Sequence, residues 1–169
     1  MGVPAADLKV RAASARDAPS ICSLCNEPAY RWGTLRMPYQ TEEAIGRWLA
    51  SFTGDDHLLV AELDGAVAGL GGLHRQPGRR AHVGVVGMGV RDACRRRGVG
   101  TAVLDALVDL ADNWLNLRRL ELTVFVDNDV AIRLYERAGF AREGILRAYA
   151  FRDGQLVDAH AMGRLRDTP

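Results

Sequence analysis

Three consecutive arginines stand directly before a Gly-x-Gly pair in the stretch Cys94–Leu104, CRRRGVGTAVL, which then continues as an apolar helical pattern. Glycines at 98 and 100 leave the backbone N–H groups of a helix N-terminus open to a phosphate. Positive side chains at that end oppose the helix dipole, so the arginines favour a bound anion over a solvated basic helix start. We expect this turn to bind a pyrophosphate without a metal.

Other anion sites fit this stretch less well. The chain carries 22 basic and 21 acidic residues, a net charge of +1, so its overall field would not attract nucleic acid or an anionic membrane. A nucleotide P-loop needs G-x-x-x-x-G-K-[ST], which is missing. The dinucleotide fingerprint G-x-G-x-x-G fails because Val103 stands at its third glycine. We therefore expect a local anion site, with no nucleic-acid or membrane partner.

The cysteines and histidines give little sign of redox or metal chemistry. Cys22 and Cys25 form a C-x-x-C, which can be a redox pair, half of a metal site, or two small residues on the buried face of a helix. The last interpretation is favoured, because no second pair accompanies the first. The histidines at 57, 74, 82 and 160 show no H-x-x-x-H spacing, so we expect no metal site.

The hydrophobic pattern predicts an α/β fold in one domain over residues 1–169, without a membrane span and in the cytoplasm. Asp64-Gly65 and Asp153-Gly154 predict tight hairpins. Glycines inside the run 83–90 predict a bulge, or a close approach to the strand. We expect strands at 8–13, 57–63, 66–73, 83–90, 120–126, 140–151 and 155–165, and helices at 17–26, from 41, at 98–115 and at 128–138. The strands 83–90 and 120–126 should be parallel across a crossover helix, and the stretch 30–40 should be a loop.

Two motifs resemble those of the GCN5-related N-acetyltransferases, the GNAT family. The first is Val90-x-x-x-x-Arg95-x-x-Gly98-x-Gly100, which opens a helix after a glycine-interrupted strand. The second is the stretch 126–140, VDNDVAIRLYERAGF, which follows in the right order and at the right separation. The resemblance implies a mixed, largely antiparallel sheet with a splayed parallel pair of central strands and helices on both faces. Phrases such as TLRMPYQ and DNWLNLRRLELTVFVDN are similar to a bacterial branch that includes free L-amino-acid N-acetyltransferases.

The resemblance implies that acetyl-CoA is the cosubstrate and assigns residues to it. The backbone of the motif strand would contact the acetyl and pantetheine groups, the arginine-glycine turn would wrap the pyrophosphate, and Asn128 would lie beside the cofactor or cap its helix. Tyr135 matches the family tyrosine that protonates the departing thiolate, a balanced transfer because phenol and thiol have pKa values of about 10 and 8.5. The cofactor-binding residues are then Met88, Gly89, Val90, Arg95, Arg96, Arg97, Gly98, Val99, Gly100, Thr101, Asn128 and Tyr135.

The sequence offers two candidates for the general base. Some family members carry a glutamate at the position of Gly84 here, which cannot act as a base. His82, two residues earlier, and Glu121, near the start of the partner strand, are the candidates, acting directly or through water. Either residue can instead be an ordinary solvated or paired side chain of a strand.

The acceptor is expected to be a small amine. Tyr30, Trp32, Met37 and Tyr39 suggest a partly apolar pocket, and Arg36 lies nearby without an acidic cluster of the kind that a polyamine would require. An amino acid, with an amine to acetylate and a carboxylate to pair with Arg36, fits better, and Tyr39 would also contact it. The alternatives are acetylation of a protein N-terminus or lysine, and an acyl-CoA-binding sensor without catalysis. The resemblance also allows a homodimer.

Overall fold

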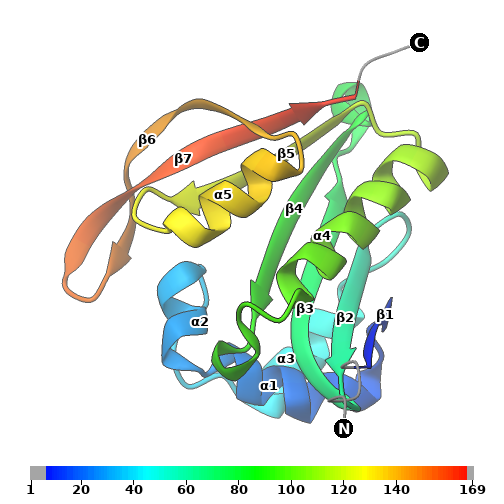
Figure 1. Ribbon diagram of the computed structural model, residues 1–169, viewed down its shortest axis with the longest axis vertical. Coiled ribbons are helices and arrows are strands. Elements are labelled where there is room, and N and C mark those ends of the chain that lie inside the picture. The colour runs from blue at the N-terminus through cyan, green and yellow to red at the C-terminus, as the bar shows by residue number, and fades with distance from the viewer. Residues whose placement is uncertain (1–6, 167–169) are drawn as a thin grey trace, which may run out of the picture.

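A seven-stranded sheet runs through the molecule in the order β1-β2-β3-β4-β5-β7-β6 (Figure 1). The computed structural model describes residues 7–166, so the ends of the predicted domain, 1–6 and 167–169, lie outside the described residues. The strands are β1 (Leu8–Ala12), β2 (His57–Leu63), β3 (Ala66–Arg75), β4 (Val83–Val90), β5 (Arg119–Phe125), β6 (Ala141–Arg152) and β7 (Gln155–Leu165). The helices are α1 (Ala18–Cys25), α2 (Pro28–Gly33), α3 (Glu42–Ala50), α4 (Val99–Asp109) and α5 (Asp129–Arg137).

The turn chemistry that the sequence predicts is present at both hairpins. Asp64 and Gly65, between β2 and β3, have φ values of 53° and 82°, and Asp153 and Gly154, between β6 and β7, have 50° and 81°. Two consecutive positive φ values match the twist of antiparallel strands, which favours Asp-Gly. The N-cap predicted at Thr41 is also confirmed, because its side chain accepts a hydrogen bond from the Ala44 N–H at 3.2 Å.

Helices cover both faces of the sheet, as expected. On one face α4 crosses β2, β3 and β4, and α5 packs beside it over the C-terminal strands (Figure 1). On the other face α1 and α3 form a second core with residues of β2 and β3. The two faces are distinguished by adjacent glycines of β3, since Gly71 lies under Val103 of α4 and Gly72 lies against Phe52, just after α3. The fold class predicted from the sequence is therefore confirmed.

The two central strands run parallel and soon separate. The pairing of β4 with β5 covers Val83 with Arg119, Gly84 with Leu120, and Val85 with Glu121. Every other neighbouring pair in the sheet is antiparallel. Beyond Val85 the two strands diverge, so the second half of β4 has no ladder partner on that side among residues 7–166. This divergence is the structural basis of the site.

Two expectations about local structure need correction. The stretch 30–40 is not entirely loop, because α2 occupies Pro28–Gly33. The bulge suggested by the glycines of β4 is absent from its pairing with β3, which keeps one register from Val90 to Gly84. The other interpretation of those glycines, a close approach to the strand, holds at Gly89, where the ring of Tyr30 from α2 lies against the backbone. No helix among residues 7–166 is both long and apolar enough to cross a membrane.

Candidate active site

A cavity of about 1060 Å³ opens where β4 and β5 separate. Its walls come from α2, β3, the second half of β4, the arginine-glycine turn, the end of β5 and α5. In Figure 1, β4 and β5 diverge between α2 on one side and α5 on the other. Since cavities of a few hundred to about a thousand cubic ångströms suit small ligands, this one can hold a cofactor and an acceptor together.

Backbone groups on β4 face the gap. The N–H of Arg91 bonds to the carbonyl of Ala68, and the carbonyl of Val83 accepts from Gln76, so the odd-numbered residues of β4 point their backbone groups at β3. By the alternation of a strand, Met88 and Val90 point theirs toward β5, where pairing has ended. Met88, Gly89 and Val90 all line the cavity. This edge can pair with an amide-bearing arm such as pantetheine and can donate an N–H to a thioester oxygen.

The arginine-glycine turn presents further N–H groups to the same cavity. Arg96 and Gly98 adopt left-handed conformations, with φ values of 60° and 82°. The first backbone bond of α4 runs from the Ala102 N–H to the Gly98 carbonyl at 2.9 Å, so the preceding N–H groups are not used by the helix. Gly98, Gly100 and Thr101 line the cavity. A pyrophosphate fits here because both the helix dipole and these N–H groups favour an anion.

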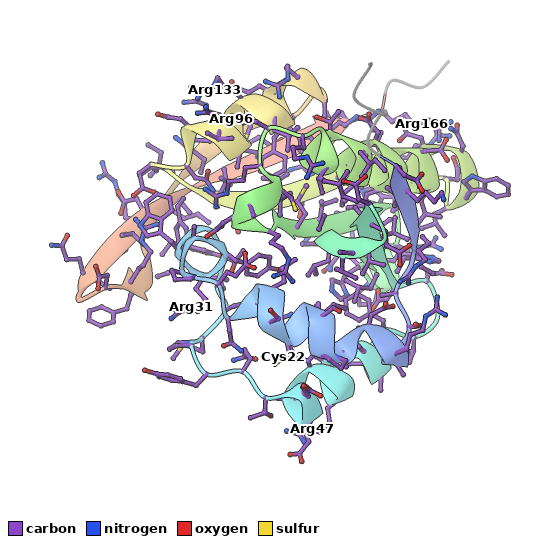
Figure 2. The ribbon with its side chains drawn as sticks, turned by 60° about the horizontal axis from the view of Figure 1, so that its bottom comes forward. Cys22, Arg31, Arg47, Arg96, Arg133 and Arg166 are labelled. Atoms are coloured by element: carbon purple, nitrogen blue, oxygen red, sulfur yellow. The ribbon has the colours of Figure 1, made fainter. Side chains whose placement is uncertain are left out.

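Arginine side chains surround this end of the cavity. Arg95, Arg96, Arg133 and Arg137 line it, and Arg95 also pairs with Asp92 at 3.2 Å. Figure 2 shows Arg96 and Arg133 at the same edge of the molecule. Neither Arg96 nor Arg133 belongs to an ion pair within residues 7–166. The two guanidinium groups are therefore available to the phosphates of a ligand.

Two of the predicted cofactor residues lie outside the cavity wall. Arg97 turns away and pairs with Asp64 at 3.0 Å, where it ties the turn to the β2–β3 hairpin. Val99 is buried and packs in the core beneath α4. Gly100 has a second role, since a Cβ there would lie 3.3 Å from Leu134 of α5. The sequence analysis did not distinguish the residues of this turn that line the cavity from those that hold the turn in place.

Tyr135 of α5 lies in the cavity wall. Its side chain is buried yet lines the cavity, and its ring packs 5.9 Å from that of Phe140. Burial raises the pKa of Tyr135 to about 12, so the phenol keeps its proton. Asn128 lines the same region and caps α5, accepting a hydrogen bond from the Ala131 N–H at 3.3 Å. Both roles considered for Asn128, a helix cap and a place beside the cofactor, are compatible with this position.

The opposite end of the cavity has an aromatic wall. The Arg36 guanidinium lies 3.8 Å from the centre of the Trp48 ring, and Trp48 meets Phe52 edge to face at 5.3 Å. Phe52 in turn packs against His74, with ring centres 4.6 Å apart. All four side chains line the cavity. Gly87, paired with Gly72, also lines the cavity, and a Cβ there would meet no atom within 4 Å, so space is open at that strand position.

The remaining sequence candidates lie away from this wall. Tyr39 is 91% exposed and does not line the cavity. His82 is exposed before the start of β4, and Glu121 pairs with Val85 where β4 and β5 are still joined. Burial raises the pKa of Glu121, but hydrogen bonds from Arg119 and Arg80 outweigh it and hold that pKa below its usual value. The structure gives neither His82 nor Glu121 a place in the cavity wall.

Trp48, Phe52 and His74 were not singled out from the sequence. No spacing links them, because they come from α3, the loop after it and β3, and only the packing of α3 against the sheet unites them. Their one sequence signal is the aromatic pair on and just after a helix with a strongly charged outer face. By contrast, Arg36 does reach the cavity, as the sequence suggested.

Comparisons with known proteins agree with this geometry. Residues 18–140 match the model of the Acetyltransferase (GNAT) family. The chain is 37% identical over 161 residues to the L-amino acid N-acetyltransferase AaaT of Escherichia coli (strain K12), covering 95% of this chain and 99% of that protein.

Solved structures share the fold. An acetyltransferase of the GNAT family from Streptococcus pneumoniae superposes with a TM-score of 0.83 at 26% identity, covering 94% of this chain and 99% of that one. The yncA acetyltransferase of Salmonella typhimurium, solved with its cofactor acetyl-CoA, gives a TM-score of 0.83 at 18% identity, covering 95% and 94%. The gap between β4 and β5, the arginine-glycine turn and the matches over nearly the whole chain lead to one conclusion: this chain belongs to the GNAT family of acetyl-CoA-dependent N-acetyltransferases.

Proposed function

We propose that the protein acetylates the α-amino group of free L-amino acids, by direct attack of the amine while both substrates are bound. The observation that carries this proposal is Arg36, a cation at the aromatic end of a cavity whose other end suits acetyl-CoA. An amino acid has a carboxylate for Arg36 and an amine that can reach toward β4. The E. coli relative, named as an L-amino acid N-acetyltransferase, supports the same substrate class.

The chain's own groups can serve each part of this reaction. Acetyl-CoA supplies an acetyl thioester; the turn at Gly98 and the nearby arginines would hold its phosphates, and the free edge of β4 would hold its arm. A backbone N–H on that edge would stabilise negative charge on the thioester oxygen as the amine attacks. Tyr135 would donate its proton to the departing sulfur, for which its burial keeps it protonated.

The aromatic wall also bears on the alternatives. A polyamine would need carboxylates to pair with its remaining ammonium groups, and Arg36 opposes it. A peptide N-terminus has no carboxylate close to its amine, so Arg36 would gain nothing from it. A sensor without catalysis would not need a buried tyrosine such as Tyr135 in the wall of the cavity that would hold the cofactor.

The test compares amino acids with the same molecules lacking the carboxylate. We would measure acetylated product by mass for L-methionine and L-phenylalanine, their decarboxylated amines, a polyamine and short peptides. A preference for the amino acids, lost in Arg36→Ala and kept in Arg47→Ala, is the expected result. Arg47 is the matched control because it is exposed on α3, on the side away from the cofactor edge (Figure 2). Equal rates with and without the carboxylate would refute the assignment of Arg36, and acetylation of peptides alone would replace the proposed substrate.

A further inference from the structure

The reaction needs a group that takes a proton from the acceptor, which arrives as an ammonium ion. Besides the tyrosines, the described residues lining the cavity include four that can accept a proton: His74, Cys94, Asp127 and Asp129. Cys94 and Asp129 stand at the cofactor end, before the phosphate-binding turn and in the first turn of α5. Asp127 is paired with Arg152. His74 alone lies in the aromatic wall at the acceptor end.

A carboxylate positions the His74 ring. Its Nδ1 lies 3.1 Å from Oδ2 of Asp56, in the turn before β2, and Asp56 is itself fixed by the Arg75 N–H, which donates to Oδ1 at 3.0 Å. The ring face packs against Phe52 at 4.6 Å. With a proton on Nδ1 directed at the carboxylate, Nε2 carries the free lone pair, the arrangement that a general base requires. The side chain is 44% exposed, so Nε2 can reach solvent and substrate.

From His74 toward Met88 the strands carry two glycines on the cavity side: Gly72, against which Phe52 lies, and Gly87, where the space is open. His74 pairs with Val85, and Gly72 pairs with Gly87, so two glycines follow His74 along the floor of the cavity. Gly72 and Gly87 both line it, and above Gly87 the space is open for 4 Å. Met88 is three residue steps beyond Val85, about 10 Å at the usual rise, a distance that the acceptor and one or two water molecules together can bridge.

We propose that His74, oriented by Asp56, is the general base of this enzyme. Nε2 takes one proton from the acceptor ammonium, directly or through water, and the freed amine forms a C–N bond to the acetyl carbon. The C–S bond breaks and Tyr135 protonates the sulfur. The extra proton on the new amide nitrogen returns to the Tyr135 phenolate, directly or through water, and the proton on His74 passes to solvent. His74 is the catalytic residue and Asp56 a positioning residue. This inference rests on the proposed function.

The charged groups around His74 determine which side chain can act on its ring. Asp56 faces Nδ1, and Arg36 lies at the other end of the Trp48–Phe52 wall. On the same strand, Arg75 extends to Asp55, at 2.6 Å, so its charge is paired. On β4 the cross-strand neighbour of His74 is the uncharged Val85. Asp56 is therefore the one carboxylate that the described structure places against the ring.

The experiment compares His74→Gln, Asp56→Asn and the control His160→Gln, a histidine of β7 that does not line the cavity. At neutral pH, His74→Gln should lower kcat about 100-fold, within the usual range for loss of a general base, and leave the Kd for acetyl-CoA unchanged. In Asp56→Asn, kcat should fall about tenfold, and in His160→Gln it should equal that of the wild type. Because amines lose their proton to solvent at alkaline pH, the deficit of His74→Gln should shrink as pH rises.

Two results would overturn the inference without touching the proposed function. One is a kcat for His74→Gln within about threefold of the wild type at neutral pH, far short of what a general base contributes. The other is a deficit that stays constant with pH, or that comes with weaker acetyl-CoA binding, since either would show a packing role. Absence of product from the wild type with every amine would instead refute the proposed function and this inference together.

Discussion

The ring of Tyr30 lies so close to Gly89 that a Cβ on that glycine would come within 2.2 Å of Tyr30 Cε2. Tyr30 is buried on α2, and Gly89 lies on the half of β4 that has left β5. The contact therefore fixes α2 against the strand edge that borders the cavity. It also explains why this strand carries a glycine at a position where its backbone shows no bulge against β3.

Alanine substitution of two glycines on β4, two residues apart, should affect the free energy of unfolding very differently. Gly89→Ala forces its methyl into Tyr30, and overpacking of this kind costs about 1–3 kcal/mol in the free energy of unfolding. Gly87→Ala meets nothing within 4 Å, so it should leave that free energy nearly unchanged. If the acceptor lies above Gly87, this variant should still raise the KM for the acceptor. Urea unfolding and steady-state kinetics of both variants test these expectations. Equal destabilisation of the two variants would contradict the predicted difference.

Removal of the Tyr135 hydroxyl should separate chemistry from cofactor binding. Tyr135→Phe keeps the ring packed against Phe140 but removes the acid, so kcat should fall about 100-fold while the Kd for acetyl-CoA stays the same. Burial raises the pKa of Tyr135 to about 12, so the acid is present below that value and is lost only above it. The kcat of the wild type should consequently show no fall near the ordinary phenol value of about 10. A fall there that disappears in Tyr135→Phe would show a solvated phenol instead.

The arginines at the phosphate end should control cofactor affinity and its salt dependence. Arg96→Ala and Arg133→Ala each remove a cavity-lining cation, and we expect the Kd for acetyl-CoA to rise about tenfold, the usual size for one charge-assisted bond. Added salt should weaken binding less in either variant than in the wild type. Arg79→Ala is the control, because Arg79 is exposed and lies outside the cavity. Unchanged titrations in both cavity variants would remove these residues from the site.

Acid stability should depend on Asp17. Hydrogen bonds from Arg11, then those from Ser14, hold the pKa of this buried carboxyl well below its usual range, against the effect of burial. A lowered pKa stabilises the fold above the ordinary value of about 4, and this contribution is lost as the pH falls further. Asp17→Asn should cost about 1–3 kcal/mol at neutral pH, because Arg11 is partly solvated. The difference in the free energy of unfolding between this variant and the wild type should decrease as the pH is lowered. The exposed Asp55→Asn should change stability by less than about 1 kcal/mol.

Local chemistry explains what the sequence predicted. The turn at Gly98 could be read from residue types alone, because its left-handed backbone and the helix start are properties of a few neighbouring residues. The same holds for the Asp64-Gly65 hairpin and for Tyr135, which lies within one contiguous motif. Such features need no knowledge of what packs against them.

The acceptor end could not be predicted in this way. The helix α2 is six residues long and ends in Gly33, a weak local signal, and its place depends on Tyr30 meeting Gly89. His74 lies 18 residues after Asp56, and only the pairing of β2 with β3 brings the two together. His82 lies two residues before the family's glutamate position, on the same strand face by alternation, but alternation indicates which face a side chain takes and not at which end two strands separate.

The short ladder between β4 and β5 divides the sheet into two halves, and this line of division is called the seam here. Three residue pairs join a four-stranded half, β1 to β4, to a three-stranded half formed by β5, β7 and β6. A ligand arm seated in the gap would take the place of a missing strand and continue the sheet across this seam. The cosubstrate would then act as a mechanical brace as well as a reagent, and the melting temperature should rise with its concentration. When the gap is empty, strand pairing between the two halves is limited to these three residue pairs.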